Sequence, residues 1–527
     1  NYNYSKKNHN FTGLLGYTSQ QTWIDDSRIT GLDFPTETFQ TLNQAAQIDQ
    51  SNTNTLKDQI GLVSYLGRLT YDYKSKYMLT ASFRTDGSSY FAPGKKYGFF
   101  PAVSAGWNIA SEPFMSEVSW LSNMKLRTSY GATGNNRITS FSYQDLLYPS
   151  NYGFGAGTGS VNLGLSPNSN VLANPGITWE RTFESNTGLD LGFLQNRFNL
   201  SAEFYHAITD KLLFNVATMG FSGSNEYINN AGKVSNTGIE FEFSSSNIKS
   251  KNFEWNTAIN FSRFKNKLLE LGGESYQYNY GERNEIYAAI IGAPSIQFLG
   301  YRTDGVWMSQ AQIDEARAQP DPLTSSLARY FTAGGLKFKD INGDNVIDVN
   351  DRVVLGDPFP DFIWGITNNF KFKGFDLNVL LQGSQGGKLI NGDANYNESK
   401  RFNANYNTDS RWLSEMHPGD GKTPYAFNGV DWMISDYVIE DASYISLRNV
   451  ILGYTIPQKT IKKLGVNSVR VYAAADNLLY FMGKDYKGIN PEARTTSSAY
   501  SSPLVSGYQR GAFPLLRTFT LGLDFNF

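Results

Sequence analysis

The sequence predicts an all-β fold, a transmembrane antiparallel β-barrel, and three observations carry that prediction. Charged residues make up only 18% of the 527 residues and aromatic residues 15%, so the chain is less charged than an ordinary soluble domain. Apolar and polar residues alternate along many segments, which is the pattern that a barrel wall in lipid requires. Short turns and long polar connections alternate between these segments, as is typical of outer-membrane barrels.

Composition excludes several other classes of protein. The formal net charge is -2, without the basic excess that is typical of nucleic-acid-binding proteins. Cysteine is absent, so disulfides, thiolate metal sites and cysteine nucleophiles are excluded. No run of about 18 apolar residues occurs, and a transmembrane helix is therefore not predicted.

The last segment of the chain shows the alternation most clearly. Its polar positions include Thr518, Thr520, Asp524 and Asn526. Its apolar positions are Phe519, Leu521, Leu523, Phe525 and Phe527. This strict period of two predicts a strand with one apolar and one polar face. The edge of a soluble sandwich would give the same pattern, so the rest of the chain has to decide.

The same pattern predicts about 14 strands along the chain, joined alternately by short turns and long connections. The predicted strands are 9–23, 61–73, 77–91, 97–111, 123–133, 178–192, 198–214, 233–247, 252–268, 361–373, 375–388, 438–456, 468–481 and 513–527. The long connections are 24–60, 134–177, 215–232, 269–360, 389–437 and 482–512. We expect 269–360 to contain further local structure, including Gly300–Trp307.

Aromatic residues flank several of the short turns. Tyr71, Tyr73 and Tyr77 flank one turn, and Phe372 and Phe375 flank another. Aromatic rings favour the lipid–water interface, so rings beside turns indicate a girdle at one edge of the membrane. Cross-strand packing of rings within ordinary hairpins explains the same residues.

Several longer motifs give the chain a specific resemblance. They are Arg84–Phe91 (RTDGSSYF), Phe99–Trp107 (FFPAVSAGW), Met124–Asn135 (MKLRTSYGATGN), Trp179–Glu180, Gly232–Glu240 and Asn490–Glu492. Together they resemble, in the same order, motifs of SusC/RagA-type TonB-dependent outer-membrane transporters. The resemblance runs from about residue 9 to residue 527.

The resemblance implies a barrel of about 22 strands, of which this chain, residues 1–527, would be the C-terminal portion. The family carries an N-terminal plug with a TonB box, and neither is found in this sequence. An open sheet of this width in lipid would leave two unpaired edges, which is prohibitive. We therefore expect the N-terminal part to be supplied by another chain or to lie outside this sequence.

The same resemblance implies a function in nutrient uptake, in the bacterial outer membrane and without enzymatic activity. It implies TonB-dependent import of oligosaccharides or peptides, with TonB acting through the plug and a SusD-like surface lipoprotein acting as a lid. The resemblance leaves undecided whether two transporter–lid pairs form a dimer. The alternatives are a receptor for siderophores or other metal chelates and, in another class, a glycan-binding adhesin or β-sandwich protein. An enzyme is not expected, because the three histidines are scattered along the chain.

One motif resembles a calcium-binding loop of the EF-hand or dockerin type. Oxygen-bearing side chains at its positions 1, 3, 5, 9 and 12, with a backbone carbonyl at position 7, would surround one ion, as Ca²⁺ prefers. These residues are Asp340, Asn342, Asp344, Asp348 and Asp351, with the carbonyl from Val346. We predict a structural Ca²⁺ that stiffens the extracellular loop 269–360. A solvated acidic turn held by its own Asx hydrogen bonds is the alternative.

Aromatic residues in the long connections are the candidates for contact with cargo. Flat rings stack on sugars and on peptide side chains alike, and they also pack loops against one another. The candidates are Trp23, Tyr152, Tyr276, Tyr278, Tyr280, Trp412 and Tyr425. The sequence does not decide between these two roles for any one ring.

Overall fold

The computed structural model forms two compact units. Unit 1 comprises Asn1–Trp107, Thr128–Ser185 and Thr209–Gly232, and unit 2 comprises Asn108–Arg127, Asn186–Ile208 and Lys233–Phe527. The structure describes all residues except 39–40, 154–160, 168–170, 218–225, 282–283, 320–322, 326–330, 395–408, 427–433, 462–464, 494–503 and 527.

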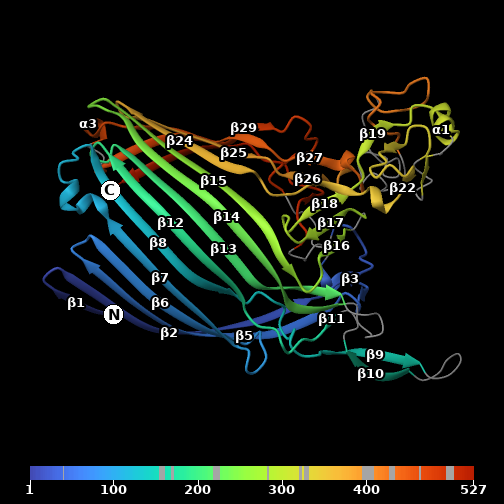
Figure 1. Ribbon diagram of the computed structural model, residues 1–527, viewed down its shortest axis with the longest axis horizontal. Helices are drawn as coiled ribbons and strands as arrows, with labels where there is room; N and C mark the ends of the chain where they lie inside the picture. The colour runs from blue at the N-terminus through green and yellow to red at the C-terminus, as the bar shows by residue number, and fades with distance from the viewer. Residues whose placement is uncertain are drawn as a thin grey trace. The chain divides into compact units, whose positions relative to one another are not determined.

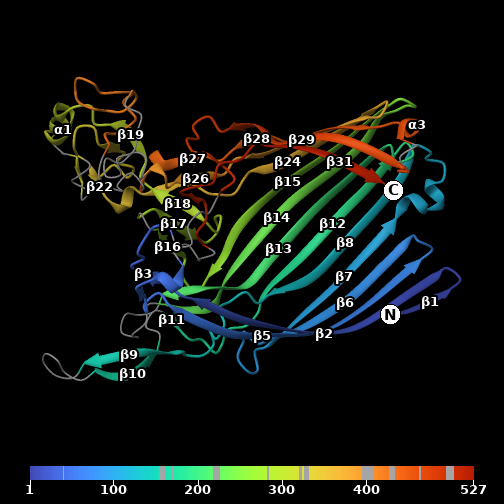
Figure 2. The same cartoon turned by 180° about the vertical axis from the view of Figure 1, so that it is seen from behind.

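The main element is a 16-stranded sheet whose long strands pair as antiparallel neighbours (Figures 1 and 2). Its strands, in sheet order, are β1 (Tyr2–Lys6), β2 (His9–Arg28), β5 (Asn54–Tyr73), β6 (Tyr77–Ser88), β7 (Tyr97–Asn108), β8 (Leu121–Asn135), β12 (Glu180–Phe193), β13 (Phe198–Ala217), β14 (Glu226–Lys249), β15 (Phe253–Leu271), β24 (Phe362–Phe372), β25 (Phe375–Gln385), β28 (Tyr444–Thr455), β29 (Ser468–Met482) and β31 (Thr518–Asn526). The short β11 (Val171–Leu172) pairs in parallel with β14. None of the described helices is long and apolar enough to cross a membrane.

The predicted strands are all present in this sheet, and the all-β prediction is confirmed. Most ends differ from the prediction by only a few residues. β5 and β14 each begin seven residues earlier than predicted, at Asn54 and Glu226, and β28 begins at Tyr444 instead of residue 438. The preceding residues Ile439–Asp441 form β27, which pairs outside the main sheet. Phe527, predicted as the last apolar position, lies outside the described residues.

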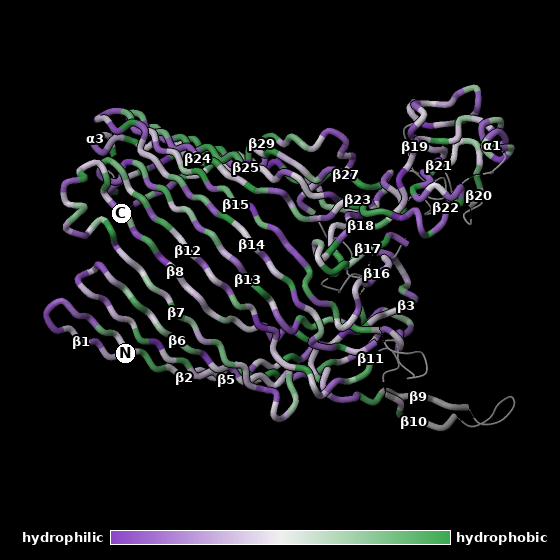
Figure 3. Tube along the Cα trace, in the orientation of Figure 1, coloured by the Kyte–Doolittle hydropathy of each residue, from purple (hydrophilic) through white to green (hydrophobic). Residues whose placement is uncertain are grey.

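The alternation of the sequence becomes two faces of the sheet. Along β6, exposed and less exposed residues alternate almost strictly, and Figure 3 shows green and purple segments interleaved along the strands. The β24–β25 hairpin shows how register is fixed, because Phe372 pairs with Phe375 across the two residues Lys373 and Gly374. Both turn residues have positive φ, as a type I′ turn requires.

The rings beside the turns pack across neighbouring strands and also stay partly exposed, and the girdle stays a prediction. The rings of Phe375 and Tyr454 on neighbouring strands are tilted against each other with centroids 4.6 Å apart, and those of His9 and Tyr73 lie 4.7 Å apart. Phe375 nevertheless stays half-exposed on the apolar face. Cross-strand packing and an exposed aromatic row are therefore two aspects of one arrangement.

The long connections of unit 2 are more than polar loops. Their described residues form four small sheets, and together they make what we call the loop body. It contains β16 (Tyr276–Tyr280), β17 (Ile286–Ile290), β18 (Gln297–Gly300), β19 (Thr303–Val306), α1 (Gln310–Arg317), β20 (Thr324–Ser325), β21 (Leu336–Phe338), β22 (Val346–Ile347), β23 (Val353–Gly356), β26 (Lys388–Asn391), β27 and β30 (Tyr508–Gln509). The expected local structure at Gly300–Trp307 is thus confirmed by β18 and β19.

The loop body has an apolar core of its own. Tyr287, Phe298, Tyr301, Ile390 and Tyr508 are fully buried and come from all three long connections of unit 2. In both views the loop body lies beyond one end of β15, β24 and β25, and α3 (Gln458–Ile461) lies at the other end (Figures 1 and 2). Long loops and short turns therefore occupy opposite ends of the strands of unit 2.

The connections of unit 1 carry smaller elements. A hairpin of β9 (Leu147–Gly153) and β10 (Val161–Pro167) pairs over its whole length. A second, very short pair joins β3 (Gly31–Leu32) and β4 (Gln47–Ile48). These connections contribute strands without a separate apolar core among their described residues.

Candidate functional site

The motifs of unit 1 converge on one buried cluster, which we call the motif core. Phe91 ends the first motif and is fully buried, and its ring centroid lies 5.5 Å from that of Trp179. Phe100, from the second motif, packs edge-on against the same indole at 5.4 Å. The indole Nε1 of Trp179 donates a 2.8 Å hydrogen bond to the carbonyl of Lys96. Residues far apart in the sequence are thus held by one tryptophan.

Polar motif residues complete this cluster. Glu180 accepts hydrogen bonds from Asn135 Nδ2 at 2.6 Å and from the backbone N–H of Leu213 at 2.7 Å. Arg84 binds both oxygens of Asp86, at 2.7 and 2.9 Å. Packing and hydrogen bonding account for these side chains, so the motif core holds these strands together.

The Asn490–Glu492 motif has a comparable role in unit 2. Glu492 accepts hydrogen bonds from Arg448 on β28 and from the hydroxyl of Tyr480 on β29. Asn490 Nδ2 donates a 3.0 Å hydrogen bond to the carbonyl of Phe513. The motif therefore ties the last long connection to two strands of the sheet.

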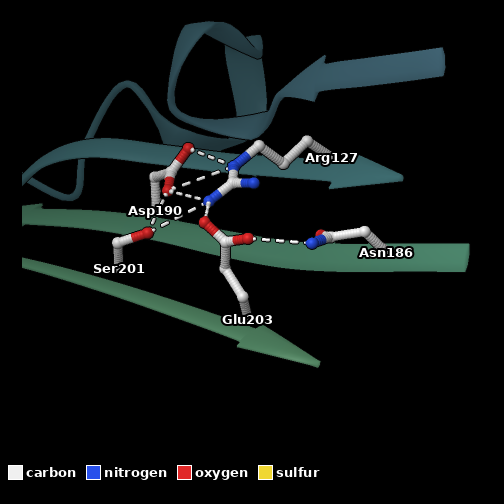
Figure 4. Close-up of polar contacts among 5 residues, drawn as sticks. All are labelled: Arg127, Asn186, Asp190, Ser201 and Glu203. Carbon is white, nitrogen blue, oxygen red and sulfur yellow. Dashed lines mark hydrogen bonds and ion pairs between the residues drawn. The ribbon is translucent and has the colours of Figure 1, made fainter. Parts of the chain in front are cut away.

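A charged cluster crosses three strands on the polar face of unit 2 (Figure 4). Arg127 on β8 donates from Nε to Asp190 on the neighbouring β12, at 3.1 Å. Its Nη2 reaches further, to Glu203 on β13. Asn186 and Ser201 bind the same two carboxylates, at 2.9 and 2.8 Å. The Arg127 side chain on β8 thus binds a carboxylate on β12 and reaches across β12 to a second carboxylate on β13.

Glycine makes this reach possible. A Cβ at Gly188 on β12 would lie 2.6 Å from Arg127 Cζ, so the guanidinium occupies the space of a missing side chain. A second arginine in unit 2 reaches across a glycine in the same way. Arg470 on β29 binds Asp376 on β25 at 2.6 Å across Gly453 on β28. Neither bridge was predicted, because the sequence has no signal for an arginine that crosses a glycine on the next strand to reach a carboxylate two strands away.

The loop body holds a buried carboxylate. Glu440 is almost fully buried, and it accepts hydrogen bonds from Asn391 Nδ2 at 2.6 Å and from the backbone N–H of Lys487 at 3.0 Å. Burial raises the pKa of Glu440, and the hydrogen bond from Asn391 opposes that shift. Burial also raises the pKa of the neighbouring Tyr486 to about 12. These groups fasten β26, β27 and the last connection to one another.

The predicted aromatic candidates fall into two groups. Tyr276, Tyr278 and Tyr280 form an exposed row on β16, and the first two rings lie 5.0 Å apart. Trp412 packs against the loop-body core and donates from Nε1 to the carbonyl of Met308 at 3.1 Å. Tyr425 lies edge-on against Trp412 at 6.4 Å.

Two candidates lie elsewhere. Trp23 is 69% exposed on β2, in unit 1. The side chain of Tyr152 lies outside the described residues. The three tyrosines of β16 and Trp23 are therefore the candidates whose rings remain open to a ligand.

The calcium-like loop folds on its own hydrogen bonds. Asp340 accepts from the backbone N–H groups of Gly343 and Asn345, both at 2.6 Å. The fully buried Asp351 accepts from Ile341 and Asp348, at 2.8 and 2.9 Å. The predicted ligands are thus folded into one loop.

Their carboxylates do not converge on one point. Asn342 and Asp344 are joined to each other by a 2.9 Å side-chain hydrogen bond, and Asp344 also accepts from the backbone N–H of Val346 at 2.8 Å. In the described part of the chain, no group of three or more His, Cys, Asp or Glu is arranged to hold a metal ion. The calcium site stays a prediction.

A large antiparallel sheet with short turns at one end and long loops at the other is the architecture of an outer-membrane β-barrel. Comparison with known proteins gives the family. Residues 1–478 match the family model described as TonB dependent receptor-like, beta-barrel, and the chain belongs to this family.

Named relatives narrow the family further. The chain is 32% identical over 535 residues to TonB-dependent receptor P3 of Formosa agariphila, covering 100% of this chain and 51% of the relative. It is 31% identical over 481 residues to TonB-dependent receptor SusC of Bacteroides thetaiotaomicron, covering 88% of this chain and 44% of the relative. The chain thus spans about half the length of the curated relatives that it matches.

A solved structure confirms the fold. The structure of the RagAB peptide transporter aligns with a TM-score of 0.80 at 22% identity, covering 99% of this chain and 54% of the matched chain. The predicted resemblance to the SusC/RagA type is confirmed, and so are the barrel fold class and the outer-membrane location. The family is one of transporters, so the prediction that the chain is not an enzyme is also confirmed.

Proposed function

We propose that the whole protein imports oligosaccharides or peptides across the outer membrane together with a SusD-like surface lipoprotein. TonB would act through an N-terminal plug, a segment that we expect from the resemblance and that is not among residues 1–527. The observation that carries the proposal is the similarity to SusC, which extends over 88% of this chain. RagAB, whose structure resembles this chain, is a peptide transporter, and this supports peptides as the second cargo class.

The structure supports a role in the passage of cargo rather than in catalysis. The polar face of unit 2 carries paired charges and amides, such as Arg127 with Asp190 and Asn378 with Asn369. In outer-membrane barrels the polar face lines the interior, and the apolar face meets lipid. At the loop end, the row Tyr276, Tyr278 and Tyr280 offers stacking surfaces to sugars or peptide side chains.

Uptake by cells tests the proposal. Cells that carry the full-length gene, with and without the gene of the lipoprotein partner, would be given labelled oligosaccharides, labelled peptides or an iron chelate. We expect uptake of an oligosaccharide or a peptide, dependent on TonB and on the lipoprotein. Uptake of the iron chelate alone would establish the siderophore alternative and overturn the proposal.

We also propose that the loop Asp340–Asp351 binds a structural Ca²⁺. Its support is the spacing of oxygens along a loop that is already folded, since a carboxylate oxygen that accepts one amide keeps a second lone pair for an ion. Limited proteolysis of the chain with Ca²⁺, with Mg²⁺ or with chelator tests this. Protection of 269–360 by Ca²⁺ that is lost in Asp344→Ala supports the site, and equal cleavage in all three conditions removes it.

A further inference from the structure

Four of the turn-end connections of unit 2 carry positive charge, whereas the connection 109–120 carries Glu112 and Glu117 and no lysine or arginine. Four connections at the turn end join β12 to β13, β14 to β15, β24 to β25 and β28 to β29, and each carries or adjoins an exposed cation. The cations are Arg197, Lys249, Lys251, Lys373 and Lys459. None of these four connections contains an aspartate or a glutamate. We call these five residues the turn rim.

Among the residues that the structure describes, the turn-rim cations differ from the ion-paired cations of unit 2, and they share their lack of an ion pair with Lys265, Lys267 and Lys422. On the sheet faces and in the loop body, Arg127, Arg470, Lys337 and Lys388 form ion pairs with carboxylates. Within the described residues, none of the five turn-rim cations forms an ion pair. Their positive charge is therefore left for a ligand outside the chain.

The cations stand next to a row of rings on the apolar face. Phe253 pairs with Phe372, Phe372 with Phe375, and Phe375 with Tyr454, so four neighbouring strands place a ring at one level. Lys373 Nζ lies 5.2 Å from the ring centre of Phe372. Such rings lie at the lipid–water interface, which puts the ammonium group at the depth of the lipid headgroups.

The same contact recurs at other turns. Arg197 lies 5.6 Å over the ring of Phe198 at the start of β13. Its Nε also donates to the carbonyl of Ser246 at 2.8 Å, which fixes the guanidinium beside the next strand without neutralising it. Unit 1 shows the arrangement independently, with Lys74 Nζ 5.3 Å over the ring of Tyr73. A cation over a ring beside a short turn is thus a repeated feature of this chain.

We propose that the turn rim binds the phosphate group of anionic phospholipids in the membrane leaflet that it meets. Short turns of outer-membrane barrels face the periplasm, so this is the periplasmic leaflet. Clustered lysine and arginine at a membrane surface attract anionic headgroups, and the rings beside them contact the glycerol and upper acyl region. This lipid site is independent of cargo and of the lipoprotein partner.

Lipid affinity in micelles tests the proposal. The full-length protein in uncharged detergent is titrated with phosphatidylglycerol and with phosphatidylcholine of the same acyl chains, and bound lipid is counted by native mass spectrometry. We expect at least tenfold tighter binding of phosphatidylglycerol. The triple variant Arg197→Gln, Lys251→Gln and Lys373→Gln should lose at least tenfold of that affinity and keep its affinity for phosphatidylcholine.

A matched variant separates the site from net charge. Lys265→Gln, Lys267→Gln and Lys422→Gln removes the same charge from exposed residues of β15 and the loop body, away from the turns. We expect it to bind phosphatidylglycerol like the unchanged chain. An equal loss in both triple variants overturns the proposal, as does equal affinity for the two lipids in the unchanged chain.

Two further arms complete the test. Because a neutralised variant can misfold, Lys251→Arg with Lys373→Arg keeps the charge and should keep the phosphatidylglycerol affinity; loss of that affinity would contradict headgroup binding. Inorganic phosphate is added as a competitor. If it displaces the lipid at equal concentration, the site belongs to free phosphate and the lipid proposal fails.

Discussion

The motif core of unit 1 and the loop-body core of unit 2 are both buried, but only the first is built largely from motifs that the sequence shows. Phe91, Phe100 and Trp179 lie in separate motifs, and each lies in or beside a long strand, because Phe91 follows β6, Phe100 lies within β7 and Trp179 directly precedes β12. Tyr287, Phe298 and Tyr508 lie in stretches that look like polar connections. The difference shows that a repeating strand pattern carries its own packing partners, whereas a core assembled from separate loops does not.

The largest expected effect comes from breaking the motif core. Trp179→Ala removes the ring against which Phe91 and Phe100 pack, and it should lower the free energy of unfolding by about 3–5 kcal/mol. Urea unfolding in detergent, followed by far-ultraviolet circular dichroism, measures this. Trp23→Ala serves as the control, because that ring is 69% exposed and should change stability by less than about 0.5 kcal/mol. Equal losses would show that Trp179 is not a packing centre.

Breaking the loop-body core should have a confined effect. Phe298→Ala removes a fully buried ring that packs edge-on against Tyr287, at a local cost of about 3–5 kcal/mol. We expect faster protease cleavage within the loop body and an unchanged urea midpoint for the sheet. A parallel fall in the sheet's midpoint would mean that the two regions of unit 2 unfold as one.

The strands themselves follow from the sequence because apolar and polar side chains must alternate wherever one face of a sheet meets lipid. Hairpin ends follow as well, since Lys373-Gly374 has the turn chemistry for positive φ. The bridges over Gly188 and Gly453 could not be predicted, because the period of two gives a residue's face but not its register with a strand two positions away. The burial of Glu440 could not be predicted either, because its partners Asn391 and Lys487 lie 49 and 47 residues away in the sequence.

A double-mutant cycle at Arg127 and Gly188 tests whether the glycine makes room for the bridge from β8 to β13. Arg127→Met leaves Asp190 and Glu203 without their shared partner and should cost about 1–2 kcal/mol, since these side chains are partly open to water. Gly188→Ala should cost a similar amount, because its Cβ would fall 2.6 Å from Arg127 Cζ. On the Arg127→Met background the alanine should be neutral or slightly stabilising. Additive losses in this double-mutant cycle would show that the glycine has another role.

The smallest expected effect is the pH response of the loop body. The pKa of Glu440 is raised in the folded protein, so the folded state binds more protons than the unfolded state between the ordinary and the raised value. The contribution of Glu440 is therefore fully present below its ordinary pKa and is lost as the pH rises through the folded value. Hydrogen exchange at Ile390 and Lys487, corrected for intrinsic rates, should show weaker protection above this window than below it. Glu440→Gln should remove that difference in protection. Asp441 in the same strand has a lowered pKa, so its own pH response has the opposite direction and cannot replace that of Glu440. An unchanged pH response in the variant would therefore assign the effect to a group other than these two.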